Sequence, residues 1–196
     1  MLSLQPPAQV YFAFILVLLL ALSPVHGKTV QEISSLEYNQ SVDRELKVGE
    51  TQFYQFALAA GEYTRVELQT GKARLSLSLL SEKNELITTI SDADSPGLKR
   101  LDIVADKPTN YPIRVVPENS LTSAAKYQLT LKEKRTATPT NRERFALHRL
   151  DWEVVSFYRQ QKKSALHQAA VKGRETAARW LALNEPERAG RMLDRA

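Results

Sequence analysis

The sequence predicts two parts: an antiparallel β-sandwich of about eight strands over residues 28–134, and a helical region over residues 142–196. Two observations carry this prediction. Apolar side chains alternate with polar ones at every second position upstream of Arg135, and they recur at every third or fourth position downstream of it. The formal charge changes at the same place, because residues 28–131 carry 12 Lys and Arg against 14 Asp and Glu, whereas residues 132–196 carry 15 against 8.

Residues 1–27 are expected to be a signal peptide. The run from Val10 to Leu22 consists almost entirely of Phe, Ile, Val, Leu and Ala, a length typical of a signal-peptide core and short for a membrane span. Pro24 follows the run, and small or tolerated residues precede a cut before Lys28. We therefore expect an exported protein, periplasmic, in the cell envelope or extracellular. The flank before the run carries no basic residue, which leaves an uncleaved N-terminal membrane anchor as the alternative.

The strands of the sandwich are predicted by alternation. Leu75, Leu77 and Leu79 are separated by serines, so one face of this strand points inward and the other meets water. Similar runs span residues 42–48, 52–58, 63–69, 85–91, 101–105, 111–116 and 127–131. Turn residues such as Ala60-Gly61-Glu62 separate them. Short strands at this spacing are typical of an antiparallel sandwich, and they leave no room for the crossover helices of a parallel sheet.

The helical region follows a polar linker predicted at residues 135–141. Thr140 and Glu143 have the spacing of a capping box, which predicts that a helix begins there. Two amphipathic stripes follow, the first through Phe145, Ala146, Leu150, Val154, Phe157 and Tyr158 and the second through Leu166, Ala169, Ala170, Gly173, Ala177, Trp180 and Leu181. Pro186 lies near the first turn of a third helix. The small residues of the second stripe allow another helix to approach closely.

Composition excludes several kinds of site. The chain has no cysteine and only three histidines, so thiolate nucleophiles, thiolate zinc sites and iron–sulfur clusters are ruled out. His148 and His167 lie on different predicted helices without the spacing of a metal motif, and we interpret them as packed or surface residues. Asp92-Ala93-Asp94-Ser95 lacks the later glutamate of a calcium loop and predicts a turn. The sequence assigns no catalytic residue, cofactor or metal, and it identifies no binding residue.

The basic side chains of the helical region suggest nucleic acid as a partner, but their arrangement argues against it. They are spread around the helices and interrupted by acids, whereas nucleic-acid binding favours a one-sided basic patch with aromatic residues between the cations. These residues include Arg142, Arg144, Arg149, Arg159, Lys162, Lys163, Lys172, Arg174 and Arg179. We interpret them as a solvated basic face, with attraction to anionic envelope surfaces as the alternative. The aromatic residues Phe145, Trp152, Phe157, Tyr158 and Trp180 are expected to pack between helices.

The first part of the chain resembles a known family. The segments Glu45-Leu46-Lys47-Val48-Gly49-Glu50, Phe53-Tyr54-Gln55-Phe56-Ala57-Leu58, Ala60-Gly61-Glu62-Tyr63 and Val66-Glu67-Leu68-Gln69 resemble the opening of bacterial pre-peptidase C-terminal-like (PPC) β-sandwich domains. The leucine strand 75–79, the turn at Asp94–Gly97 and the strand 127–131 also fit this pattern. The resemblance implies the same sandwich that the alternation predicts.

A second resemblance concerns the junction and the helices. Arg135-Thr136-Ala137-Thr138 is similar to the junction that joins such a sandwich to tetratricopeptide repeats in a subset of exported bacterial proteins, some of which continue into a caspase-like CHAT protease domain. It implies that the helices are the start of a tetratricopeptide-like region. Two departures stand out: Thr136 replaces the usual proline, and Arg174 and Glu175 occupy positions where a repeat favours a large aromatic residue. A CHAT protease acts through a Cys/His pair, and this chain has no cysteine.

These observations favour a protein that is not an enzyme. We expect an exported binding module. Its sandwich is a recognition or spacer domain, and its helices dock a protein or peptide partner. Tyr54 and Tyr63 are candidates both for the core and for contact with a ligand. The alternative is the regulatory N-terminal part of a secreted CHAT-type peptidase, and a third hypothesis is an adhesin that uses the basic helices on the envelope surface.

Overall fold

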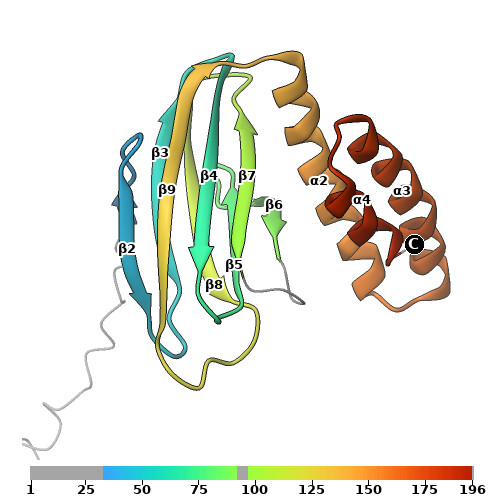
Figure 1. The fold of residues 1–196 in the computed structure, drawn as a ribbon, viewed down its shortest axis with the longest axis horizontal. Helices are drawn as coiled ribbons and strands as arrows, with labels where there is room; N and C mark the ends of the chain where they lie inside the picture. The colour runs from blue at the N-terminus through green and yellow to red at the C-terminus, as the bar shows by residue number, and fades with distance from the viewer. Residues whose placement is uncertain (1–32, 92–96, 196) are drawn as a thin grey trace, which may run out of the picture. The chain divides into compact units, whose positions relative to one another are not determined.

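The computed structural model describes residues 33–91 and 97–195, and these belong to one compact unit. The signal peptide predicted at residues 1–27 and the aspartate turn at residues 92–95 lie outside the described residues. The architecture is a β-sandwich followed by three helices (Figure 1). None of the described helices is both long and apolar enough to cross a membrane.

Two sheets form the sandwich. One sheet has five strands in the order β1-β3-β8-β5-β6, and the other has four in the order β2-β9-β4-β7. The strands are β1 (Ile33–Ser35), β2 (Ser41–Leu46), β3 (Gln52–Leu58), β4 (Glu62–Thr70), β5 (Leu75–Leu80), β6 (Leu86–Ile90), β7 (Leu98–Val104), β8 (Thr109–Pro117) and β9 (Ala125–Thr136). All strand pairs are antiparallel except β1 with β3. The predicted sandwich is confirmed.

The interior of the sandwich is filled by the residues that the alternation placed there. Leu77, Val66 and Leu129 are fully buried, and the two sheets contribute to a single apolar cluster. Each predicted run corresponds to an observed strand with shifts of a few residues. The sequence missed β1, because a strand of three residues with two serines has too little alternation to be recognised.

Three helices follow the sandwich: α2 (Pro139–Arg159), α3 (Lys163–Ala182) and α4 (Pro186–Leu193). The capping box predicted at Thr140 and Glu143 is wrong, because the box is formed by Thr138 and Asn141. The Thr138 hydroxyl accepts from the Asn141 amide at 3.2 Å, and the Asn141 side chain accepts from the Thr138 amide at 3.1 Å. Pro139 at the first helical position favours the earlier start.

The predicted linker at residues 135–141 is almost absent. β9 continues to Thr136 and α2 begins at Pro139, so only two residues separate the last strand from the first helix. The sequence did not predict that β9 continues to Thr136, because the end of this strand is polar. Its last five residues are exposed, and an exposed strand segment shows no apolar alternation.

The helices pack on one edge of the sandwich. α2 lies against β6 and β7, the edge strands of the two sheets, and α3 packs on α2 and on α4 (Figure 1). A second apolar cluster of seven buried residues joins the three helices, with Trp180 at 0% exposure. Ala169, Gly173 and Ala177 of α3 are buried, as the small-residue stripe predicted. The helical pair is present, while its assignment to the tetratricopeptide type stays a prediction.

Candidate functional site

The junction between the sandwich and the helices contains a buried polar network centred on Asp102. Asp102 lies on β7 directly opposite Arg65 of β4, and its side chain is 4% exposed. The Arg65 guanidinium donates from Nε at 3.1 Å and from Nη2 at 2.9 Å to Asp102 Oδ1, and the Tyr63 hydroxyl donates to the same oxygen at 2.5 Å. Burial opposes ionisation, but the hydrogen bonds from His148 and Tyr63 and the Arg65 charge outweigh it and lower the pKa of Asp102.

His148 brings α2 into this network. Its side chain is 1% exposed, and its Nε2 lies 3.4 Å from Asp102 Oδ2. Arg188 of α4 lies 3.2 Å from Nδ1; because a guanidinium only donates, this contact assigns the lone pair to Nδ1 and the proton to Nε2. The Asp102 backbone amide lies 3.3 Å from Nε2. It would donate to Nε2 only in the other tautomer, in which Nδ1 carries the proton. Burial and the Arg188 charge outweigh Asp102 and lower the pKa of His148 to about 4, so the ring is neutral at pH 7.

Backbone contacts extend the same junction to β6 and β7. The hydroxyl of Thr88, a fully buried residue of β6, donates to the His148 carbonyl at 2.7 Å. Arg188 Nη2 donates to the Arg100 carbonyl of β7 at 3.0 Å. Both edge strands are therefore hydrogen-bonded to helices, and at β7 the bond satisfies a backbone carbonyl of an edge strand.

A half-buried carboxyl, that of Asp151, lies near Arg188. Asp151 of α2 accepts from the Trp180 indole at 2.8 Å, and Trp180 also meets His148 edge-on and carries Arg188 over its ring. Burial raises the pKa of Asp151 to about 6, although the indole hydrogen bond and nearby arginines favour the charged form. The network thus links all three helices to the sandwich.

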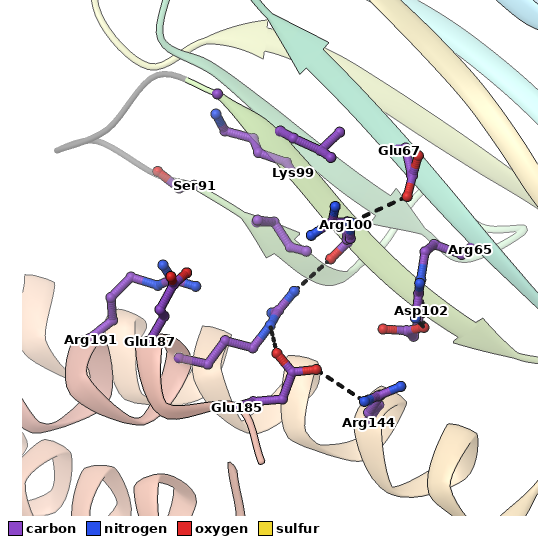
Figure 2. Close-up of a pocket in the computed structure, with 14 residues that line it drawn as sticks. Arg65, Glu67, Ser91, Lys99, Arg100, Asp102, Arg144, Glu185, Glu187 and Arg191 are labelled. Atoms are coloured by element: carbon purple, nitrogen blue, oxygen red, sulfur yellow. Dashed lines mark hydrogen bonds and ion pairs between the residues drawn. The ribbon is translucent and has the colours of Figure 1, made fainter. Parts of the chain in front are cut away.

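Two hollows open beside the network. The first has a volume of about 560 Å³ and lies between β4, β7 and α4, as Figure 2 shows. The second has a volume of about 350 Å³ and lies between the end of β6 and the helices α2 and α4. Ile90, Ser91, Arg188 and Arg191 line both hollows, so the two adjoin, and together they are called here the junction groove.

The two hollows of the junction groove differ in their lining. The first is lined mainly by charged residues, six basic and four acidic. The pairs Arg100–Glu67 at 3.3 Å and Arg144–Glu185 at 3.0 Å, drawn as dashed lines in Figure 2, engage two of the acids. The second combines four arginines and two aspartates with the apolar or aromatic side chains of Trp152, Val155, Tyr158 and Met192. Positive charge is in excess in both.

The Asp102–His148 pair can be compared with the catalytic Asp–His pairs of hydrolases. A buried Asp–His pair orients a general base in hydrolases, but it needs an adjacent nucleophile and a free ring nitrogen that faces substrate. Both ring nitrogens of His148 already face protein groups, and no serine, threonine or tyrosine hydroxyl bonds to them within residues 33–91 and 97–195. Those same residues contain no cluster of three or more side chains suited to hold a metal ion.

No family model matches the chain, and no curated protein does. Several solved structures are similar to its sandwich. The pre-peptidase C-terminal domain of a collagenase from Bacillus anthracis is 16% identical over 52% of this chain and 96% of that one, with a TM-score of 0.42. The copper-binding surface protein CorA of Methylomicrobium album BG8 is 11% identical over 51% and 96%, with a TM-score of 0.40. The Aeromonas hydrophila periplasmic lysozyme inhibitor PliG is 12% identical over 51% and 97%, with a TM-score of 0.37. At these values the matches say nothing of function.

The residues that the sequence singled out lie in different places. His148 is buried in the network, while His167 is exposed on α3. Tyr54 and Tyr63, the candidates both for the core and for contact with a ligand, are buried. The Tyr63 hydroxyl donates to Asp102, and the Tyr54 hydroxyl shares a buried hydrogen bond with the Tyr127 hydroxyl at 2.5 Å. The expectation that the aromatic residues pack between helices fails for Phe145, which packs against the apolar cluster of the sandwich, and holds for Trp180 and Phe157, which lie in or against the helical cluster. It is wrong for Tyr158, which is 41% exposed on α2 beside the junction groove.

The sequence missed the residues that make the junction. Arg65 and Asp102 give no local signal, because they meet only through the register of β4 and β7. Asp151 and Arg188 are charged residues of amphipathic helices, and such residues normally face water. One hint was available, since polar residues 148 and 151 lie on the same side of the predicted helix as Leu147 and Val154, one turn apart.

Proposed function

We propose that this chain is an exported, non-enzymatic binding module that takes a protein or peptide partner in the junction groove. The observation that carries the proposal is that groove: two hollows share Arg188 and Arg191 and are walled by strands on one side and helices on the other. Recognition sites are commonly concave and lie where two structural layers meet. Export rests on the signal peptide predicted at residues 1–27.

The buried network supports a binding role through rigidity. Arg188 is anchored to His148 and to the Arg100 carbonyl, and its side chain is 16% exposed. A guanidinium held in place loses less conformational freedom when a ligand arrives, which favours affinity. In this proposal the Asp102–His148 pair holds the residues of the groove wall in place, and the sandwich is the scaffold of the site.

A peptide display library, incubated with the full chain, tests this proposal. We expect the wild-type protein to retain a subset of peptides, to release them at their original mass, and to lose them when Arg191 is changed to Gln. Arg174→Gln is the matched control, since Arg174 is exposed on α3 outside both hollows. Cleaved peptides in the eluate, or no retention by the wild-type protein, would overturn the proposal.

A further inference from the structure

We propose that the ligand of the junction groove is an acidic peptide that carries an apolar side chain next to its carboxylates. This inference rests on the function proposed above and specifies the chemistry of the partner. The acidic part is assigned to the first hollow and to the arginines shared by both hollows, and the apolar side chain is assigned to the second hollow.

Charge in the groove points to an anion. Of the acids that line it, Asp102, Glu67 and Glu185 are already engaged by Arg65, Arg100 and Arg144, and Asp151 accepts from an indole. Arg191 has no ion pair to another side chain within residues 33–91 and 97–195, and it lines both hollows. A guanidinium in a polar groove is suited to a carboxylate, which it binds through two parallel hydrogen bonds.

The second hollow supplies the apolar half of the recognition. Trp152, Val155 and Met192 form its apolar surface, and Tyr158 is 41% exposed at its side. An exposed aromatic residue next to a concave surface is typical of a contact that is completed by a partner. A volume of about 350 Å³ is enough for a large apolar side chain together with part of the peptide backbone.

The distribution of acids favours a peptide over an anionic membrane surface. Glu67, Glu187 and Asp194 line the groove among the arginines, so a flat negative surface would meet repulsion as well as attraction. A peptide avoids this cost because it places its carboxylates only where guanidinium groups are available. The groove also discriminates against nucleic acid, whose phosphates are continuous along the strand.

The test measures the affinity of the full chain for synthetic peptides by fluorescence anisotropy. We expect peptides with carboxylates and an aromatic or leucine side chain to bind, amide analogues with Gln and Asn in place of the acids to bind at least about tenfold more weakly, and binding to weaken as salt is raised. Arg191→Gln should weaken the acidic peptides about tenfold, whereas Arg174→Gln should leave them unchanged. Glu187→Gln should tighten binding, because it removes a repulsive charge from the groove wall.

A second variant pair tests the apolar half. Tyr158→Ala should weaken peptides that carry the apolar side chain and leave purely acidic peptides unchanged, while Leu181→Ala, exposed on α3 outside both hollows, should change neither. Preference for neutral or basic peptides, or binding to phosphatidylglycerol vesicles in place of peptides, would overturn this inference. If the library peptides retained earlier bind but are not acidic, the proposed function survives and only the ligand class is wrong.

Discussion

The interior of the sandwich and the junction with the helices are both buried, but different chemistry fills them. The interior consists mainly of leucines, valines and isoleucines from the two sheets, together with Phe56, Tyr111 and a pair of hydrogen-bonded tyrosines. The junction consists of an aspartate, a neutral histidine and arginines at fixed distances. Burial of apolar area stabilises the interior and has little directionality. In the junction each buried charge is costly unless its partner is in place, so the charged pairs fix the orientation of the helices on the strands.

This difference implies a division of labour. The sandwich has an extensive apolar core of its own, while the apolar cluster of the helices contains seven buried residues, and we expect the junction to fix the position of the helices. Changes in the junction should therefore loosen the helices and the groove before they affect the strands. The predictions below separate the two regions, and they run from the largest expected effect to the smallest.

The largest effect is expected at Trp180, where the two kinds of stabilisation meet. Its ring is fully buried in the helical cluster, and its indole donates to Asp151. Trp180→Ala should lower the free energy of unfolding by about 4 kcal/mol, because it leaves a large cavity and removes the hydrogen bond to the half-buried Asp151 carboxyl. Hydrogen exchange should show the loss of protection in α2 to α4 with the strands retained. Equal loss in β5 or β8 would contradict the division between the two regions.

A control for this change lies on the neighbouring helix. Trp152 is half-buried and is covered by Arg159 at 5.4 Å. Trp152→Ala should cost far less stability than Trp180→Ala, since a partly exposed ring loses less buried area. The comparison distinguishes the position of the ring from the presence of tryptophan as such.

Removing the charge of Asp102 should have the next largest effect. Asp102→Asn leaves Arg65 without its buried partner, and we expect a loss of about 3 kcal/mol measured by urea unfolding. Asp106→Asn is the matched control, because Asp106 pairs with Arg142 at 3.1 Å but its side chain is 91% exposed, and it should change stability by less than about 0.5 kcal/mol. If both variants lose the same stability, the junction is not a site of buried electrostatics.

The pH dependence of stability separates two groups within the junction. The pKa of His148 is about 4 in the folded protein against 6.5 ordinarily, so its contribution is complete above pH 6.5 and is lost as the pH falls towards 4. The pKa of Asp151 is raised from 3.8 to about 6, so the folded state holds a proton that the unfolded state releases, and its contribution grows as the pH falls through the same window. Each amounts to something on the order of 3 kcal/mol, and in the wild-type protein the two largely cancel.

Asp151→Asn exposes the histidine contribution. The amide oxygen still accepts from the Trp180 indole, but the titration at this position is gone. Between pH 6.5 and 4 the variant should lose on the order of 3 kcal/mol more stability than the wild-type protein, while His148→Gln should show the opposite trend. Urea unfolding at several pH values measures both, and parallel curves for all three proteins would refute the assignment.

Particular elements show how far the sequence alone could reach. The leucines of β5 predicted a strand because the alternation is a local pattern, and the stripe through Ala169, Gly173 and Ala177 predicted close helix packing for the same reason. The pair Arg65–Asp102 could not be predicted, since it depends on how β4 and β7 align across 37 residues of chain. The junction groove could not be predicted from the sequence either, because it forms only when α2 and α4 dock on two edge strands.

The smallest predicted effect concerns the start of α2, where the sequence pointed to the wrong residue. Thr138 caps the helix through its hydroxyl, and Thr140 is exposed within the first turn. Thr138→Ala should cost about 1 kcal/mol and Thr140→Ala should cost little, as measured by thermal unfolding. Because β9 ends only two residues before α2, a frayed helix start should also weaken the groove wall. Peptide binding by Thr138→Ala should therefore fall slightly, while the hydrogen-exchange protection of the sandwich strands stays unchanged. A larger loss of stability in Thr140→Ala than in Thr138→Ala would show that Thr140 is the cap, as the spacing of Thr140 and Glu143 suggested.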